Sequence, residues 1–200
     1  MQPEDTLYSI AWRHDIDFKD LAAWNNLGPS MRIEPGQILV LNRAHSVGPA
    51  ADIDARAHRD IPRLEKPKPF PDLGRPSGAV PSTAWVWPTR AFTAPTPVAG
   101  GGVLILGAVG QDIVAAAAGK VVYVGSGLRG YGNLVIIKHS DTLLSAYAHN
   151  RELSVREGQM VKSGARIGAM GLGPRQIPSL YFEIRFNGKP VDVSPYLGKR

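Results

Sequence analysis

The stretch GYGNLVIIKHSDTLLSAYAH, residues 130–149, carries the strongest structural signal in the chain. Residues 134–138 are apolar at nearly every position, which is the pattern of a strand buried on both faces. Residues 140–142, Ser-Asp-Thr, have turn composition, and residues 143–149 return as a second apolar run. This segment therefore predicts a β-hairpin in the interior of a sheet.

Short strands of the same kind lie on either side of this hairpin. Residues 119–125 form one between two glycines, and residues 165–170 and 180–186 form two more. Glycines punctuate the intervening chain, and no long helical pattern separates the strands. This spacing predicts a mainly β fold, a sandwich or barrel-like sheet, over residues 86–200.

The first 42 residues have a different pattern. Asp5 can cap a helix whose apolar residues recur at helical spacing from Leu7 onward. Asp17 gives a capping-box-like start to a second helix over residues 18–25. A Pro-Gly turn then precedes an apolar strand at residues 37–41. Between these parts, residues 43–85 contain seven prolines without an apolar period, and they predict an extended linker.

The composition excludes several classes of function. The 200 residues include no cysteine, so disulfides, thiolate metal sites and a cysteine nucleophile are excluded. No apolar run approaches the length of a membrane span, and the first residues lack the pattern of a signal peptide. The net charge of +6 is concentrated in residues 86–200, which hold 13 Lys and Arg against 6 Asp and Glu. A basic surface of this kind suits an anionic polymer or an acidic protein, or simply keeps the chain soluble.

The segments DTLYSIA (5–11), LAAWN (21–25) and IEPGQIL (33–39) resemble a LysM domain. The resemblance implies a small βααβ fold that binds N-acetylglucosamine-containing glycans such as peptidoglycan. Trp12 and Trp24 have an alternative interpretation as core residues rather than sugar platforms. A helix-turn-helix for nucleic acid is not favoured, because this segment is net acidic. The positions that match the family's glycan groove are Asp5, Thr6, Leu7, Ile33 and Pro35.

The segments GKVVY (119–123), GYGNLVIIKH (130–139), SAYAH (145–149), VREGQ (155–159) and FEIR (182–185) resemble the LytM, or peptidase M23, family. The resemblance implies a duplicated hybrid motif fold. Active members hold zinc with a His-x-x-x-Asp motif and with the second His of a His-x-His motif, which leaves one position for water. The matching ligand positions here are Gly100, Leu104 and Tyr181, and Ser179 stands at the first His of the pair. No metal, no cofactor and no enzymatic activity are therefore expected.

One catalytic position of the family, His149, is retained. If residues 140–142 form a hairpin turn, His139 and His149 lie at opposite ends of the hairpin, about 20 Å apart at ~3.3 Å per residue, and cannot share a metal. Ser145 and His149 on one strand are not by themselves a catalytic pair. His149 remains either a relic of the lost site or part of a partner-binding surface.

A LysM domain (1–42), a Pro-rich linker (43–85) and a degenerate LytM domain (86–200) together resemble the NlpD-type activators of cell-wall amidases. The resemblance implies a non-catalytic periplasmic protein that binds peptidoglycan and activates an N-acetylmuramoyl-L-alanine amidase at cell division. It implies membrane attachment only through a lipid anchor upstream of this chain, and no nucleic-acid partner. The alternatives are a peptidoglycan-binding scaffold and, less favoured, an active zinc endopeptidase. The predicted partner-binding residues are Leu104, Arg129, Tyr131, His149, Arg175, Ser179 and Tyr181.

Overall fold

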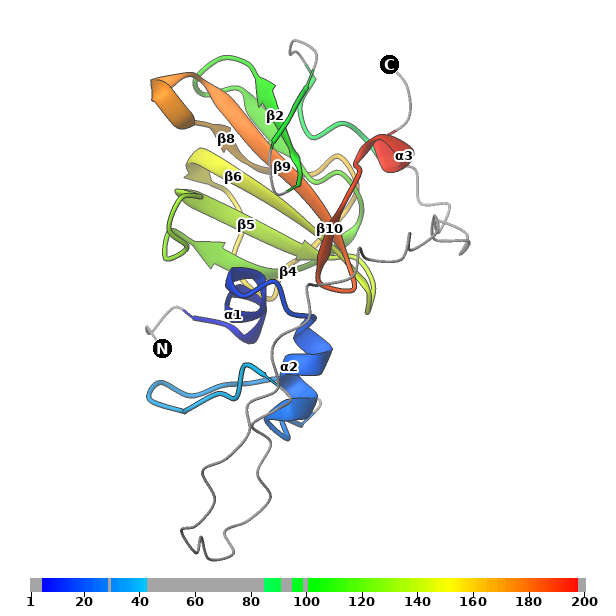
Figure 1. Cartoon of the computed structure of the whole chain (residues 1–200). Helices are drawn as coiled ribbons and strands as arrows, with labels where there is room; N and C mark the ends of the chain where they lie inside the picture. Colours follow the sequence, from blue (N-terminus) through cyan, green and yellow to red (C-terminus); the bar gives the residue numbers. More distant parts are fainter. Residues whose placement is uncertain (1–4, 29, 43–84, 91–94, 99–100, 198–200) are drawn as a thin grey trace, which may run out of the picture.

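The computed structural model describes residues 5–28, 30–42, 85–90, 95–98 and 101–197. The predicted linker lies outside the described residues except at Trp85, and Gly100 lies outside them as well. Within the described part, the chain forms two short helices, a large antiparallel sheet and a C-terminal helical turn (Figure 1). No helix among these residues has the length and apolar character needed to cross a bilayer.

The mainly β prediction is confirmed, and the ten strands belong to one connected sheet. Seven of them lie in the order β1-β2-β9-β6-β5-β4-β7. The predicted hairpin is its centre, because β5 pairs with β6 and β6 pairs in turn with β9. The strands of this path are β1 (Thr96–Pro97), β2 (Val103–Leu106), β4 (Gly119–Gly125), β5 (Asn133–Lys138), β6 (Leu143–Leu153), β7 (Met160–Val161) and β9 (Ser179–Phe186).

Strand β6 is longer than predicted because it forms hydrogen bonds with strands in both layers of the fold. Its first half pairs with β5 and β9, and its second half, after a register shift, pairs with β8 (Arg166–Met170). Strand β8 also pairs with β3 (Asp112–Val114), so the sheet folds over itself into a sandwich. The remaining elements are β10 (Lys189–Val191), which pairs with β9, a 3-10 helix (Pro174–Gln176) and α3 (Ser194–Leu197).

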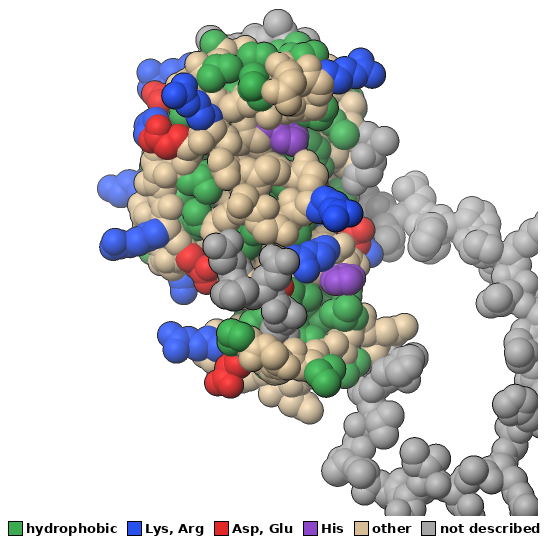
Figure 2. All heavy atoms as spheres, turned by 90° about the vertical axis from the view of Figure 1, so that its left-hand side faces the viewer, with side chains coloured by type: hydrophobic (Ala, Val, Ile, Leu, Met, Phe, Trp, Pro, Cys, Tyr) green, Lys and Arg blue, Asp and Glu red, His purple; other side chains and the backbone are tan. Residues whose placement is uncertain are grey.

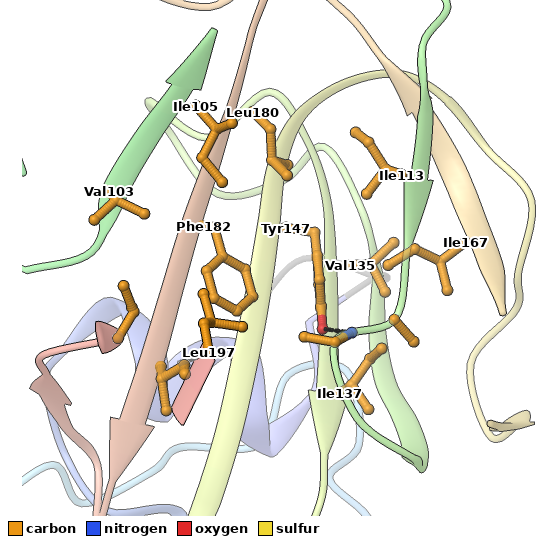
Figure 3. Packing of buried hydrophobic residues seen from close by; sticks show 14 of the residues in the cluster. Val103, Ile105, Ile113, Val135, Ile137, Tyr147, Ile167, Leu180, Phe182 and Leu197 are labelled. Atoms are coloured by element: carbon orange, nitrogen blue, oxygen red, sulfur yellow. Dashed lines mark hydrogen bonds between the residues drawn. The ribbon is translucent and has the colours of Figure 1, made fainter. Parts of the chain in front are cut away.

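The main core fills the space between these layers. Tyr147 and Phe182 are fully buried at its centre, with their ring centroids 5.2 Å apart (Figure 3). The Tyr147 hydroxyl accepts a hydrogen bond from the backbone N–H of Ala116 at 2.8 Å, so its polar end is satisfied. Burial raises the pKa of Tyr147 to about 12, so this hydroxyl stays protonated and neutral at physiological pH.

A second hydrophobic cluster covers the opposite face of the same sheet. Leu134 and Ile136 of β5 point into it, whereas Val135 and Ile137 point into the main core. The cover comes from α1 (Leu7–Arg13), which lies next to β4 in Figure 1, and from buried residues of α2 (Phe18–Trp24), which packs against α1. Each fully buried Leu or Ile side chain stabilises the packing by about 1.5–3 kcal/mol, so the N-terminal segment is held firmly on the sheet.

Both predicted helices are present, but the cap of the first differs from the prediction. The N-cap of α1 is Thr6 rather than Asp5, and Thr6 and Ser9 form a reciprocal capping box. The carboxylate of Asp5 instead forms an ion pair with Arg13, the last residue of α1, at 2.9 Å. The hydroxyl of Thr6 is one residue closer to the first helical N–H groups and therefore takes the capping position. Asp17 caps α2 as predicted, accepting from the N–H of Lys19.

The predicted strand at residues 37–41 is wrong as a regular strand, because no described segment pairs with it. A strand needs a hydrogen-bonded neighbour, and here a side chain takes part of that role. The amide of Asn25, just after α2, accepts from Val40 N–H at 2.6 Å and donates to Val40 C=O at 2.9 Å. Asn25 also donates to Leu21 C=O, so it ties this segment to α2.

Candidate functional site

Tyr181 has contacts with three of the other predicted partner-binding residues, and we call this cluster of Leu104, Tyr131, His149 and Tyr181 the aromatic groove. Strands β2 and β9 place Leu104 directly opposite Tyr181. The Tyr181 hydroxyl lies 2.9 Å from the backbone oxygen of Gly101 and also contacts the carboxylate of Glu183. Burial, reinforced by the Glu183 charge, raises the pKa of Tyr181 well above its usual value. The side chain is therefore a neutral phenol held in place by its own strand and by β2.

This donor set does not fit zinc. Leu104 has no donor atom, and the phenol of Tyr181 is kept protonated and is already engaged by Gly101 and Glu183. A protonated phenol is a poor ligand for a metal that prefers imidazole, thiolate or carboxylate. In the described part of the chain, no three His, Asp or Glu side chains come together in a way that could hold a metal ion.

His149 lies beside Tyr181 in a backbone conformation that only its surroundings can maintain. Its φ is +64°, in the left-handed region that non-glycine residues rarely adopt. Its N–H donates to Tyr131 C=O and its own C=O accepts from Gly171 N–H, each at 2.9 Å. Burial lowers the pKa of His149, which favours the neutral imidazole. Two loops thus hold this imidazole at the groove.

Aromatic side chains line the groove next to His149. The ring of Tyr131 meets that of Tyr181 edge-on at 5.7 Å, and the His149 ring meets Tyr181 at 6.3 Å. Tyr131 is half-buried, and burial raises its pKa. The structure therefore brings together four of the predicted residues, with Leu104 and Tyr181 on facing strands and Tyr131 and His149 against the Tyr181 ring.

The other three predicted partner-binding residues lie in different settings. Arg129 is exposed and lines a hollow that also includes Tyr131. Arg175 is exposed in the 3-10 helix, with a φ of +57°. Ser179 is fully buried, and its hydroxyl donates to Ile177 C=O, so it supports the groove from within and offers no contact surface. A side chain at Gly173 would collide with Ser179 Oγ, at 2.1 Å.

The loops at this end of the sheet add exposed apolar side chains. Val109, Leu172 and Ile177 are each between 45% and 48% exposed, an unusual degree for large aliphatic residues. The two loops that carry them adjoin each other, because Gly107 N–H donates to Pro178 C=O and Gly110 N–H donates to Met170 C=O. In the view of Figure 2, hydrophobic side chains gather at the upper end of the molecule, close to a histidine, with Lys and Arg around the edge.

His139, not His149, forms a hydrogen bond with Ser145. His139 Nε2 lies 2.7 Å from Ser145 Oγ, and its Nδ1 lies 2.8 Å from Ala118 C=O. This geometry resembles a serine–base pair, but Ser145 is fully buried and Trp85 stacks on the His139 ring, so no substrate can reach the hydroxyl. Burial lowers the pKa of His139 to about 4. The pair is therefore structural. The register places His139 and His149 at opposite ends of the hairpin, as predicted.

A buried cationic contact between the two helices and the sheet was not predicted. The Arg185 guanidinium lies 3.8 Å from the Trp12 ring centre and donates to the Trp12 C=O at 2.9 Å. It pairs with the buried Glu183 at 2.6 Å and with the exposed Asp15 at 3.0 Å. Trp12 is thus a core residue at an interface, whereas Trp24 is only half-buried. No local pattern could pair residues 173 positions apart.

The predicted glycan-groove residues line a second, separate cleft of about 460 Å³. Asp5, Thr6, Leu7 and Ile33 form part of one wall, and Pro35 is exposed outside it. The opposite wall belongs to the large sheet. Its residues are Lys120, Val121, Val122, Lys138, Glu157 and Gly158.

Comparisons with known proteins agree with both parts of the chain. The family model for the LysM domain matches residues 2–42, and that for peptidase family M23 matches residues 99–193. A lipoprotein NlpD/LppB homolog of Pseudomonas aeruginosa is 41% identical over 98% of this chain and 75% of its own length. The murein hydrolase activator NlpD of Escherichia coli is 34% identical over 98% of this chain and 66% of its own length.

A solved structure supports the fold of the larger part. The crystal structure of a putative peptidase M23 from Pseudomonas aeruginosa superposes with a TM-score of 0.53 at 26% sequence identity. The match covers 62% of this chain and 53% of the other. This likeness supports an M23 fold for the larger part of the chain.

Proposed function

Because this chain belongs to the NlpD/LppB family of LysM and M23 domain proteins, we propose that it activates murein hydrolases instead of cutting peptidoglycan itself. The target we propose is a periplasmic N-acetylmuramoyl-L-alanine amidase, itself a zinc enzyme. The M23 domain binds the amidase, and the LysM domain holds the complex on peptidoglycan during cell division.

The observation that supports this proposal is the setting of Tyr181, which the family resemblance places at a zinc-ligand position. Its phenol is fixed by Gly101 and Glu183, so the groove has lost the means to activate water. What remains is a cluster of partly buried side chains, with one leucine, two tyrosines and an imidazole. Partly buried aromatic residues of this kind dominate binding energy at protein interfaces. The groove is therefore better suited to hold a protein segment than to hydrolyse one.

Activation follows if the amidase has closed and open states. A partner that binds the open state more tightly raises its population by the ratio of the two affinities. The LysM domain adds a second attachment, because binding to the wall raises the local concentration of the activating groove near the substrate of the amidase. Neither effect requires any chemistry in this chain.

The test is dye release from labelled peptidoglycan by this protein alone, by the amidase alone, and by the two together. We expect release only, or much more strongly, from the mixture. Release by this protein alone would overturn the proposal. No enhancement in the mixture, while the protein still sediments with the wall, would favour the scaffold function.

A groove variant makes the test specific. Tyr131→Ala combined with His149→Ala is expected to lower the stimulated rate at limiting protein about thirtyfold, since interface aromatics often contribute 2 kcal/mol or more. Met160→Ala is the matched control, because Met160 is 71% exposed on β7, at the opposite edge of the sheet. Equal stimulation by both variants would show that the amidase binds elsewhere.

A further inference from the structure

The cleft between the N-terminal helices and the sheet combines two kinds of wall. One wall holds the start of α1 and the loop after α2, residues 5–8 and 30–33. The other wall holds β4, the end of β5 and the turn before β7. A ligand that filled this cleft would touch both the LysM part and the M23 part of the chain.

The charges in this cleft favour an anionic ligand. Arg32 stands on the LysM wall, and Lys120 and Lys138 stand on the sheet wall. The two carboxylates of the cleft are Asp5, which is 6% exposed and paired with Arg13, and Glu157. In the part of the chain that the structure describes, no ion pair within 4 Å engages Arg32 or Lys120, and the nearby Glu157 carboxylate interacts with the charge of Lys120.

Lys138 is already positioned by its neighbours. Its ammonium pairs with Asp141 at 2.8 Å and lies 5.1 Å from the ring centre of Phe18 in α2. The contact with Phe18 joins the sheet to the LysM part. It lies next to Lys120, which pairs with Lys138 across strands β4 and β5. The ammonium of Lys120 and the guanidinium of Arg32 stand on opposite walls of the cleft.

A bare N-acetylglucosamine polymer carries no charge that could use these cations. Peptidoglycan does, because the peptide attached to each muramic acid has more carboxylates than amines. The cleft volume of about 460 Å³ lies in the usual range of 300–1,000 Å³ for ligand sites. Thus the LysM wall can hold acetamido sugars while the cations meet the peptide that branches from the same strand.

We propose that this cleft is a composite site for peptide-bearing glycan, in which Arg32 and Lys120 bind carboxylates of the stem peptide. This inference rests on the proposed function, because it specifies the form of the wall to which the LysM part attaches. It has a consequence for an amidase activator. An amidase hydrolyses the amide bond between muramic acid and the stem peptide. The naked glycan product keeps one lactyl carboxylate on each muramic acid but loses the several carboxylates of the peptide, so the protein prefers the uncut substrate.

The experiment compares two soluble glycans of equal length, one with its stem peptides and one from which an amidase has removed them. The full chain is titrated with each by calorimetry at low ionic strength. We expect the peptide-bearing glycan to bind about tenfold more tightly, since two partly exposed ion pairs contribute up to about fivefold each. The preference should shrink at 0.5 M salt, where screening is strong.

The variants assign the preference to the cleft. Arg32→Gln with Lys120→Gln should bind both glycans with equal affinity, no more tightly than the wild type binds the naked one. Arg151→Gln, an exposed cation outside the cleft on β6, should keep the preference. The proposal is overturned if the wild type binds both glycans equally, if the double variant keeps the preference, or if it loses both ligands.

The two proposals fail in different ways. A protein that activates the amidase but binds both glycans equally loses only the composite site. A protein that prefers the peptide-bearing glycan but does not stimulate dye release keeps the composite site and loses the activator function.

Discussion

Removing the positive charge of Arg185 tests how the helices are attached to the sheet. Arg185→Met leaves the Glu183 carboxylate, only 1% exposed, without its cation. Breaking a buried pair by removing one partner costs about 3–5 kcal/mol, because the remaining charge has no solvent. Asp15 is 64% exposed and regains water, so its lost pair adds less than about 1 kcal/mol. We therefore expect a loss of about 3–5 kcal/mol, most of it from Glu183, with a smaller part from the Trp12 C=O, which loses its donor.

The assay is urea unfolding of the full chain, followed by circular dichroism and by tryptophan fluorescence, because Trp12 lies on the guanidinium. Asp15→Asn is the control and should cost less than about 1 kcal/mol. Glu183→Gln added to Arg185→Met should recover a large part of the loss, since no buried charge then remains. A loss from Arg185→Met as small as that from Asp15→Asn would refute the reasoning, and so would additive effects in the double variant.

Three further outcomes follow from single contacts. Burial lowers the pKa of His139 to about 4, whereas a histidine in the unfolded chain takes up a proton near pH 6.5. The contribution of the neutral His139 to the free energy of unfolding is therefore fully present above pH 6.5 and is lost as the pH falls towards 4. Urea unfolding should show about 3 kcal/mol more acid destabilisation in the wild type than in His139→Gln; equal pH profiles would contradict this. Asn25→Ala removes both hydrogen bonds to Val40, so hydrogen exchange at the Val40 amide should accelerate at least tenfold, and an unchanged rate would show that other contacts hold the segment. Gly173→Ala places a methyl group 2.1 Å from Ser179 Oγ and should lower amidase stimulation in the dye-release assay, and Ser179→Ala should restore part of it; no rescue would mean that the strain lies elsewhere.

The sequence predicted the five longest strands of the sheet because their apolar signals are local, whereas it missed the shorter strands and wrongly predicted one at residues 37–41. The run at residues 134–138 even indicated burial on both faces, which required a second covering layer. The sequence did not identify the segment that covers this face of the sheet, because the apolar faces of α1 and α2 could pack on any apolar surface. Thr6 and Asp5 are both good N-caps, and only the geometry of the first turn decides between them. The groove residues were predicted through the family resemblance, whereas the burial of Ser179 depends on how residues 171–178 fold back over it.

The position of α1 relates the two candidate sites to each other. Its first turn lines the glycan cleft through Leu7 and Tyr8, and its last turn, through Trp12 and Arg13, lines the hollow that contains Arg129 and Tyr131. A helix of seven residues is about 10 Å long at ~1.5 Å per residue. Glycan held in the cleft therefore lies about one helix length from the edge of the aromatic groove. An amidase bound at the aromatic groove would meet the same glycan strand that the LysM part holds. Attachment to the wall and activation of the amidase would then occur at one place, whatever the length that residues 43–84 span.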